Sequence, residues 1–146
     1  MEKKIDYMTL GRDGVSLMNE FDAYLNTLDV DPLLRELIKI RTSQINGCAY
    51  CLDVHTKVAL NLGETPRRLM VLSAWKDADV FSPAEKSVLN LVDHVTRVST
   101  EGVPTEVYDD VRLYYSDTEY VVFVFIINHM NAWNRLSISM GNRVVK

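Results

Sequence analysis

The chain has 146 residues, of which 47% are hydrophobic and 25% charged, and it carries a formal net charge of −4. This length and composition predict one packed domain spanning residues 1–146 and exclude a disordered chain. The acidic balance, without a basic stripe, argues against a nucleic-acid partner. No long apolar run follows the polar start of the chain, and the most apolar segment, 120–127, is shorter than the ~20 residues that span a bilayer. We therefore expect no membrane association and a cytoplasmic location.

Helix start and stop signals predict an all-α domain with about six to seven helices, and no hairpin signal is present. Residues 7–27 are expected to form the first helix. Asp31-Pro32 is an N-cap followed by proline and begins a second helix, which Asn46-Gly47 ends. A third helix starts near Cys48 and runs to Leu62, and Gly63 is its stop.

The second half of the chain repeats these signals. Thr65-Pro66 begins a short helix towards Trp75, and Pro104-Thr105 begins another. Capping boxes at Ser82–Glu85 and Ser116–Glu119 begin longer helices, which end near Val98 and near Met140-Gly141. The last of these is rich in β-branched and aromatic residues at its start, which favours a strand by propensity. Its capping box and its length favour a buried helix.

The two cysteines of the chain, Cys48 and Cys51, are separated by two residues, and His55 follows one helical turn after the second. If a helix begins at Cys48, both sulfurs lie in its first turn, where the helix dipole and free N–H groups favour a thiolate. His55 can share their face. A disulfide across this spacing distorts a regular first turn, which suits a pair that cycles between two redox states. The pattern predicts redox chemistry.

Two other interpretations of the cysteine pair stay open. The thiols could be buried structural side chains. They could also hold zinc, with Cys48, Cys51 and His55 as three ligands and His94 or His129 as the fourth. Structural zinc sites usually have a second closely spaced ligand pair, which the chain lacks, and a lone helical histidine is more often a packing residue. We therefore expect no metal.

Glu36 lies twelve residues before Cys48, with Leu33 and Leu37 among its neighbours on the predicted helix. A carboxylate among apolar side chains loses water and becomes a better base near neutral pH. The pattern alone favours a simpler interpretation, a boundary glutamate that pairs with Lys39 or is exposed.

The segment from Glu36 to Lys57, ELIKIRTSQINGCAYCLDVHTK, resembles the core motif of the AhpD-like alkylhydroperoxidases, members of the carboxymuconolactone decarboxylase superfamily. LGETP (62–66), LSAW (72–75) and NAWNRL (131–136) are also similar to that family. The resemblance extends from about residue 15 onward. It implies an all-helical fold, self-association as dimers, trimers or hexamers, and thiol-dependent reduction of hydroperoxides without a metal or bound organic cofactor.

The resemblance also implies a role for each site residue. Cys51 is then the peroxidatic thiol and Cys48 the resolving one, His55 relays the proton, Glu36 is the base, and an external thiol or dithiol reduces the disulfide. Without the resemblance, the residues do not decide which cysteine is the thiolate. Proximity to the helix start favours a thiolate at Cys48, whereas the spacing to His55 favours Cys51. Tyr50 is a secondary candidate. The best-known peroxidase of the family has a histidine there, and a phenol carries protons poorly because it ionises only near pH 10.

Three alternatives to a peroxidase remain. The same cysteine pair would serve a disulfide reductase or a redox-sensing protein. A decarboxylase-like member of the superfamily with another substrate is possible by fold, although the CxxC pair counts against it. The third is a structural or binding protein with inert thiols. In each case Trp75 and Trp133 are expected to be core or subunit-interface anchors.

Overall fold

Every regular element in the computed structural model, which describes residues 5–146, is helical. This described part of the chain contains nine α-helices and one 3-10 helix. The α-helices are α1 (Tyr7–Leu10), α2 (Arg12–Asn26), α3 (Pro32–Asn46), α4 (Ala49–Asn61), α5 (Pro66–Val71), α6 (Pro83–Thr96), α7 (Val98–Glu101), α8 (Thr105–Arg112) and α9 (Asp117–Met140), and the 3-10 helix is η1 (Leu72–Asp77). The predicted all-α class is confirmed, and the predicted number of six to seven helices was too low. None of the helices in residues 5–146 has the length and apolar character needed to cross a membrane.

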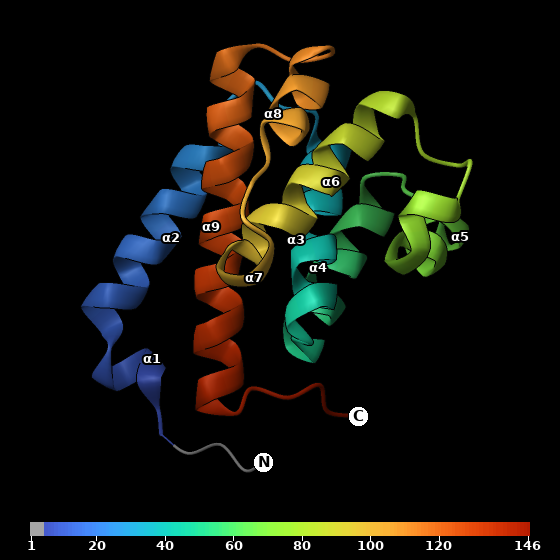
Figure 1. Cartoon of the computed structure of the whole chain (residues 1–146). Helices are drawn as coiled ribbons and strands as arrows, with labels where there is room; N and C mark the ends of the chain where they lie inside the picture. The colour runs from blue at the N-terminus through green and yellow to red at the C-terminus, as the bar shows by residue number, and fades with distance from the viewer. Residues whose placement is uncertain (1–4) are drawn as a thin grey trace.

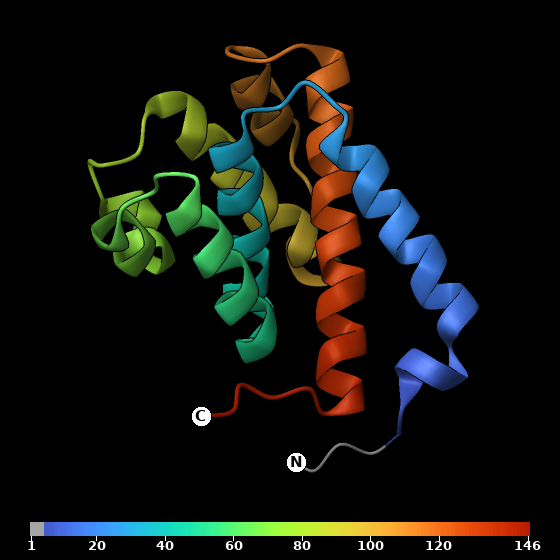
Figure 2. The same ribbon diagram turned by 180° about the vertical axis from the view of Figure 1, so that it is seen from behind.

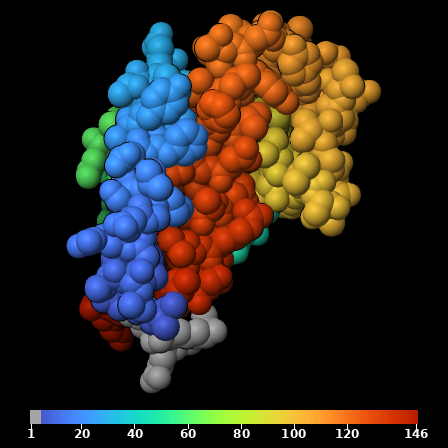
Figure 3. Space-filling model, turned by 90° about the vertical axis from the view of Figure 1, so that its left-hand side faces the viewer, coloured from blue at the N-terminus to red at the C-terminus, as the bar shows by residue number. Residues whose placement is uncertain are grey.

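Helix α3 lies at the centre of the fold, where it packs against α9, α4 and α6. The long helix α9 stands beside it, and α2 runs along the side of α9 that faces away from α3 (Figures 1 and 2). Seen from that side, α2 lies directly against α9 (Figure 3). Helix α5 lies on the opposite flank of the molecule from α2 (Figure 1).

Two buried apolar clusters pack against different faces of α3. One contains Ile38 with Phe123 of α9, and the other contains Leu37 with Leu72 of η1. Because adjacent residues of α3 face different clusters, the helix is enclosed on most of its circumference, and residues 34–43 are all buried. Four of these buried positions carry charged side chains, which need partners because an unpaired buried charge is costly: Arg35, Glu36, Lys39 and Arg41.

Side-chain caps begin the main helices where the sequence predicts them. Asp31 accepts a hydrogen bond from the Leu34 N–H at 2.9 Å, and Ser82 and Ser116 each form a complete capping box. The β-branched start of α9 is helical, as the capping box at Ser116 predicts, because Phe123 and its neighbours are buried against α3 and α6. Burial outweighs the modest β propensity of this segment.

Two predicted helices are interrupted and one short turn, α7, was not predicted, which accounts for the larger number of elements. The first, over 7–27, breaks at Gly11, where the backbone is non-helical (φ −108°, ψ 23°) and a Cβ would meet the Tyr7 carbonyl oxygen at 3.0 Å. The helix after Ser82 ends at Thr96, because Arg97 leaves helical geometry before the separate turn α7. The segment towards Trp75 divides into α5 and η1.

Candidate active site

The cysteine pair lies at the turn between α3 and α4. Gly47 ends α3 with a left-handed backbone (φ 69°), a conformation that glycine adopts without strain. Cys48 is the N-cap of α4 with an extended backbone (φ −86°, ψ 92°), which agrees with the predicted start near Cys48. Cys48 and Cys51 form a disulfide with a Cα–Cα distance of 5.4 Å. Because Cys48 is outside the regular helix, the pair is bridged without two helical residues having to approach each other.

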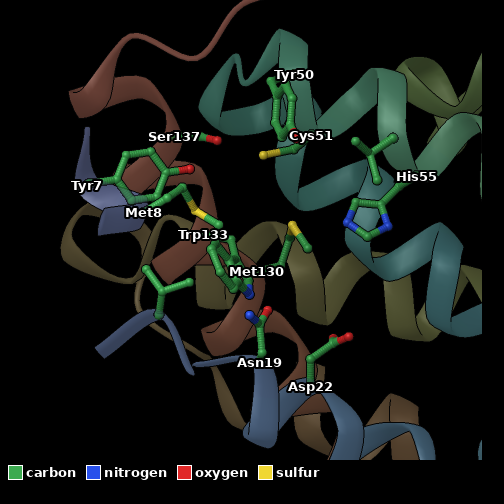
Figure 4. A pocket seen from close by; sticks show the side chains of 12 residues that line it. Tyr7, Met8, Asn19, Asp22, Tyr50, Cys51, His55, Met130, Trp133 and Ser137 are labelled. Atoms are coloured by element: carbon green, nitrogen blue, oxygen red, sulfur yellow. The ribbon is translucent and has the colours of Figure 1, made fainter. Parts of the chain in front are cut away.

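Only one of the two sulfur-bearing residues faces the main cavity of the site. Cys48 and Cys51 are both buried, at 1% and 5% exposed, but Cys51 lines a cavity of about 290 Å³ and Cys48 does not. Figure 4 shows the Cys51 sulfur directed into the space between α4 and α9. The wall is contributed by α1 (Tyr7, Met8), α2 (Val15, Asn19, Asp22), α4 (Tyr50, Cys51, Val54, His55) and α9 (Met130, Trp133, Ser137).

His55 lines the same cavity and is held from behind by Glu36 of α3. The distance between His55 Nδ1 and Glu36 Oε2 is 2.8 Å, and both side chains are largely buried. An ionised carboxylate can only accept, so Nδ1 carries the hydrogen and Nε2 of the neutral imidazole is a proton acceptor. The predicted residues Glu36, His55 and Cys51 are thus brought to one place by α3 and α4.

The other oxygen of Glu36 lies 3.6 Å from Lys39 Nζ, and Lys39 Nζ is also 3.3 Å from Asp22 Oδ1 on α2. The pairing of Glu36 with Lys39, one interpretation of the sequence, is therefore present together with the contact to His55. Glu36 is buried, so a boundary position is wrong. Sequence reasoning missed Lys39 and Asp22 as parts of the site. The spacing of Lys39 three residues after Glu36 was a signal for the first, and no local pattern indicates Asp22.

His129 and His94 have partners other than the cysteines. His129 is buried on α9, and its Nε2 accepts a hydrogen bond from Trp133 Nε1 at 3.0 Å. Burial, more than any nearby charge, lowers the pKa of His129, so the ring is neutral near pH 7. His94 Nδ1 lies 3.0 Å from the Gly102 carbonyl oxygen. No group of three or more His, Cys, Asp or Glu residues in the range 5–146 is arranged to hold a metal ion.

The other side chains that the sequence singles out, Tyr50, Trp75 and Trp133, lie on different helices. Tyr50 precedes Cys51 on α4, lines the cavity and is 42% exposed. Trp133 forms part of the cavity wall, and Trp75 belongs to the core, where its Nε1 donates to Asp93 at 3.3 Å. Trp75 thus has the core position, one of the two that the sequence predicts for it.

A helical fold with a CxxC pair and a histidine one turn later agrees with the comparison to family models, in which residues 14–94 match the carboxymuconolactone decarboxylase family. The chain belongs to this family. It is 43% identical over 143 residues to the uncharacterized protein YdfG of Bacillus subtilis, a match that covers 98% of this chain and 97% of YdfG.

Two solved structures have folds similar to that of this chain. ATU0492 of Agrobacterium tumefaciens, a protein of unknown function with a suggested role as the antioxidant defence protein AhpD, superimposes with a TM-score of 0.96 at 27% identity, covering 99% of this chain and 100% of that one. The debrominase Bmp8 superimposes with a TM-score of 0.81 at 18% identity, covering 94% of this chain and 74% of Bmp8. The first likeness supports an AhpD-like member of the family, and the second shows the fold alone.

Proposed function

We propose that this protein is a thiol-dependent peroxidase that reduces hydroperoxides with Cys51 and Cys48. One observation carries the proposal: Cys51 and His55 line the same cavity, and buried Glu36 holds Nδ1 of His55 at 2.8 Å. This is the arrangement of a nucleophile, a base and a group that orients the base. Family membership and the likeness to ATU0492, with its suggested antioxidant role, support the same conclusion.

The proposed cycle starts with reduced cysteines. His55 Nε2 takes the proton of the Cys51 thiol, and the thiolate attacks one oxygen of the hydroperoxide. The O–O bond breaks, the leaving alkoxide takes the proton from His55 to become an alcohol, and Cys51 becomes a sulfenic acid. The Cys48 sulfur then attacks the Cys51 sulfur, which forms the disulfide and releases water. An external thiol or dithiol returns both cysteines to thiols by exchange.

Accessibility supports the assignment of the two cysteines. A hydroperoxide in the cavity reaches Cys51, whereas Cys48 lies behind it at 1% exposure. Cys48 is the residue to which Cys51 is bonded in the disulfide, so it is placed to resolve the sulfenic acid. The position of Cys48 at the helix start favours a thiolate at Cys48. We give more weight to the cavity and to the spacing from His55, both of which favour Cys51 as the attacking thiol.

The remaining parts of the proposal concern Tyr50 and the setting of the reaction. Tyr50 stands at the cavity wall as a hydrogen-bond donor rather than a proton carrier, so we assign the proton relay to His55 and Glu36 alone. The cycle needs thiols that are kept reduced, which places it in a reducing compartment such as the cytoplasm. No metal or organic cofactor takes part in it. Self-association as dimers, trimers or hexamers stays a prediction.

The test is a peroxide-consumption assay on the wild type, Cys51→Ser and Cys48→Ser, with hydrogen peroxide and an organic hydroperoxide as substrates and dithiothreitol as reductant. We expect Cys51→Ser to reduce turnover to the rate of dithiothreitol alone, because the chain contains no other thiol able to attack once Cys48 is shielded. Cys48→Ser should turn over slowly and accumulate a sulfenic acid. Retention of full activity by both variants contradicts the proposal.

The same assay separates the alternatives. A redox sensor consumes about one equivalent of peroxide in a burst and then only at the slow rate at which its disulfide is reduced, whereas a peroxidase turns over continuously. A disulfide reductase turns over with a disulfide substrate and not with peroxide. Inert thiols react with neither.

A further inference from the structure

A row of alternating charges runs from His55 through buried Glu36 and Lys39 to Asp22, which is partly exposed at the cavity wall. Glu36 bridges His55 and Lys39, at 2.8 Å and 3.6 Å, and Lys39 bridges Glu36 and Asp22, the latter at 3.3 Å. The Lys39 side chain is only 5% exposed, so its ammonium depends on these two carboxylates for compensation. Asp22 comes from α2 and lines the same cavity as His55, and it lies below His55 in the view of Figure 4.

The charges of this row balance only when His55 is protonated. With Lys39 charged and both carboxylates ionised, Asp22, Lys39 and Glu36 together carry one net negative charge, and an imidazolium at His55 brings the total to zero. Removal of Asp22 leaves an excess of positive charge beside an imidazolium, and removal of Lys39 leaves an excess of negative charge. The two changes therefore act on His55 in opposite directions.

We propose that Lys39 and Asp22 are positioning residues that set how readily His55 accepts a proton. They act through Glu36, and neither touches the reacting sulfur in the proposed cycle. The relevance of the inference to catalysis rests on the proposed function, because it assumes that His55 is the base of the reaction. The charge coupling itself does not depend on the substrate.

Other titratable groups near His55 do not complete or disturb this row. On α9, His129 Nε2 is 3.9 Å from Asp22 Oδ1, but burial lowers the pKa of His129 and its Nε2 accepts from Trp133, so it adds no charge. On α4, Cys51 is in the disulfide, and Asp53 and Lys57 form an ion pair with each other at 2.7 Å. On α3, the Arg41 guanidinium is bound by Asp93 of α6. Within residues 5–146, Asp22, Lys39 and Glu36 are the charged groups that form this row.

The experiment is a proton NMR titration of the imidazole Hε1 signals in the oxidised protein, in which the cysteines do not titrate. The chain has three histidines, so His55 is assigned with one His55→Gln variant, and His94 serves as an internal reference. In Asp22→Asn, the midpoint of the His55 titration should fall by about half a unit or more. In Lys39→Met it should rise by a similar amount, and the double variant should return close to the wild type.

Two controls separate charge from structure. Lys39→Arg keeps the charge and should hold the wild-type midpoint. Asp53→Asn removes a carboxylate from the helix that carries His55, but one whose partner is the well-exposed Lys57 rather than buried Lys39, and it should shift the midpoint by less than about 0.2 unit. If Lys39→Met leaves the buried Glu36 carboxylate without its ammonium partner and does not fold, Asp22→Asn decides the question alone.

A His55 midpoint in Asp22→Asn that is unchanged or higher than in the wild type overturns the inference, as does a shift of the same sign in both single variants. Because no peroxide is present, either result is obtained whether or not the protein proves to be a peroxidase. A failed peroxide assay with the expected opposite shifts therefore rejects the proposed function and keeps the charge coupling. In a working peroxidase, the acid limb of the rate profile should move in the direction of the NMR midpoint for each variant.

Discussion

Replacing Glu36 with glutamine tests the role of the carboxylate behind His55. The variant keeps the size and hydrogen-bonding shape of the side chain but removes its charge, so His55 loses the ionised partner 2.8 Å from Nδ1. The Glu36 side chain is 7% exposed, which means that water cannot replace the lost charge. Lys39 keeps a carboxylate neighbour in Asp22, so its ammonium is not left alone.

The size of the effect follows from that one contact. A hydrogen bond to a charged group contributes about 1.5–3 kcal/mol. The contact is strongest when His55 carries the thiol proton, in the step where Cys51 becomes a thiolate, so its loss falls mainly on the barrier. We therefore expect kcat/KM for a hydroperoxide to fall by about 10- to 150-fold.

The assay is steady-state peroxide consumption with dithiothreitol, together with urea unfolding to confirm that the variant is folded. Glu20→Gln is the matched control, since it makes the same chemical change at an exposed position of α2 and should leave kcat/KM as it is. A folded Glu36→Gln protein that keeps more than about half of the wild-type kcat/KM refutes the proposed role of Glu36, because the lost interaction would then be worth less than about 0.5 kcal/mol.

Three further predictions concern stability, each measured by urea unfolding. Asp93→Asn should lower the free energy of unfolding by about 3–5 kcal/mol, because buried Arg41, bound by Asp93 at 2.7 Å, loses its counter-charge. Asp53→Asn breaks an ion pair with the well-exposed Lys57 and should cost less than about 1 kcal/mol, so an equally small loss in Asp93→Asn contradicts this prediction. Ser116→Ala should remove about 1 kcal/mol by breaking the capping box that begins α9, and an unchanged midpoint of unfolding counts against a capping role. Because burial lowers the pKa of His129 from its ordinary 6.5, the unfolded chain binds that proton more readily, so stability should fall as the pH drops below about 6.5. His129→Gln, whose amide oxygen can still accept from the neighbouring indole, should show a smaller fall, and an identical pH dependence in the two proteins disproves the assignment.

The sequence predicted those features of the fold that short segments determine. Helix starts at Asp31, Ser82 and Ser116 were found because a cap and its partner are three residues apart. The break at Gly11 was missed because the apolar pattern continues across it, and a single glycine inside a helix lowers its stability by only about 1 kcal/mol relative to alanine. The end predicted for α6 near Val98 was right to within two residues, because α6 ends at Thr96.

The same difference between local and long-range features separates the site residues that the sequence predicted from those it did not. Cys48, Cys51 and His55 belong to one segment, so their spacing alone was enough to group them. Glu36 lies on the preceding helix, where the pattern favoured a pairing with Lys39, and the structure shows that Glu36 contacts both Lys39 and His55. No sequence pattern links α2 to this site, because its approach depends on how α2 packs against α9.

The central claim is that Cys51 is the residue that takes oxygen from the peroxide. The most direct test treats reduced Cys48→Ser and Cys51→Ser with one equivalent of hydrogen peroxide in the presence of dimedone and locates the adduct by peptide mass spectrometry. We predict a dimedone adduct on Cys51 in Cys48→Ser, formed much faster than any adduct on Cys48 in Cys51→Ser. A faster adduct on Cys48, or no adduct in either variant, contradicts the claim.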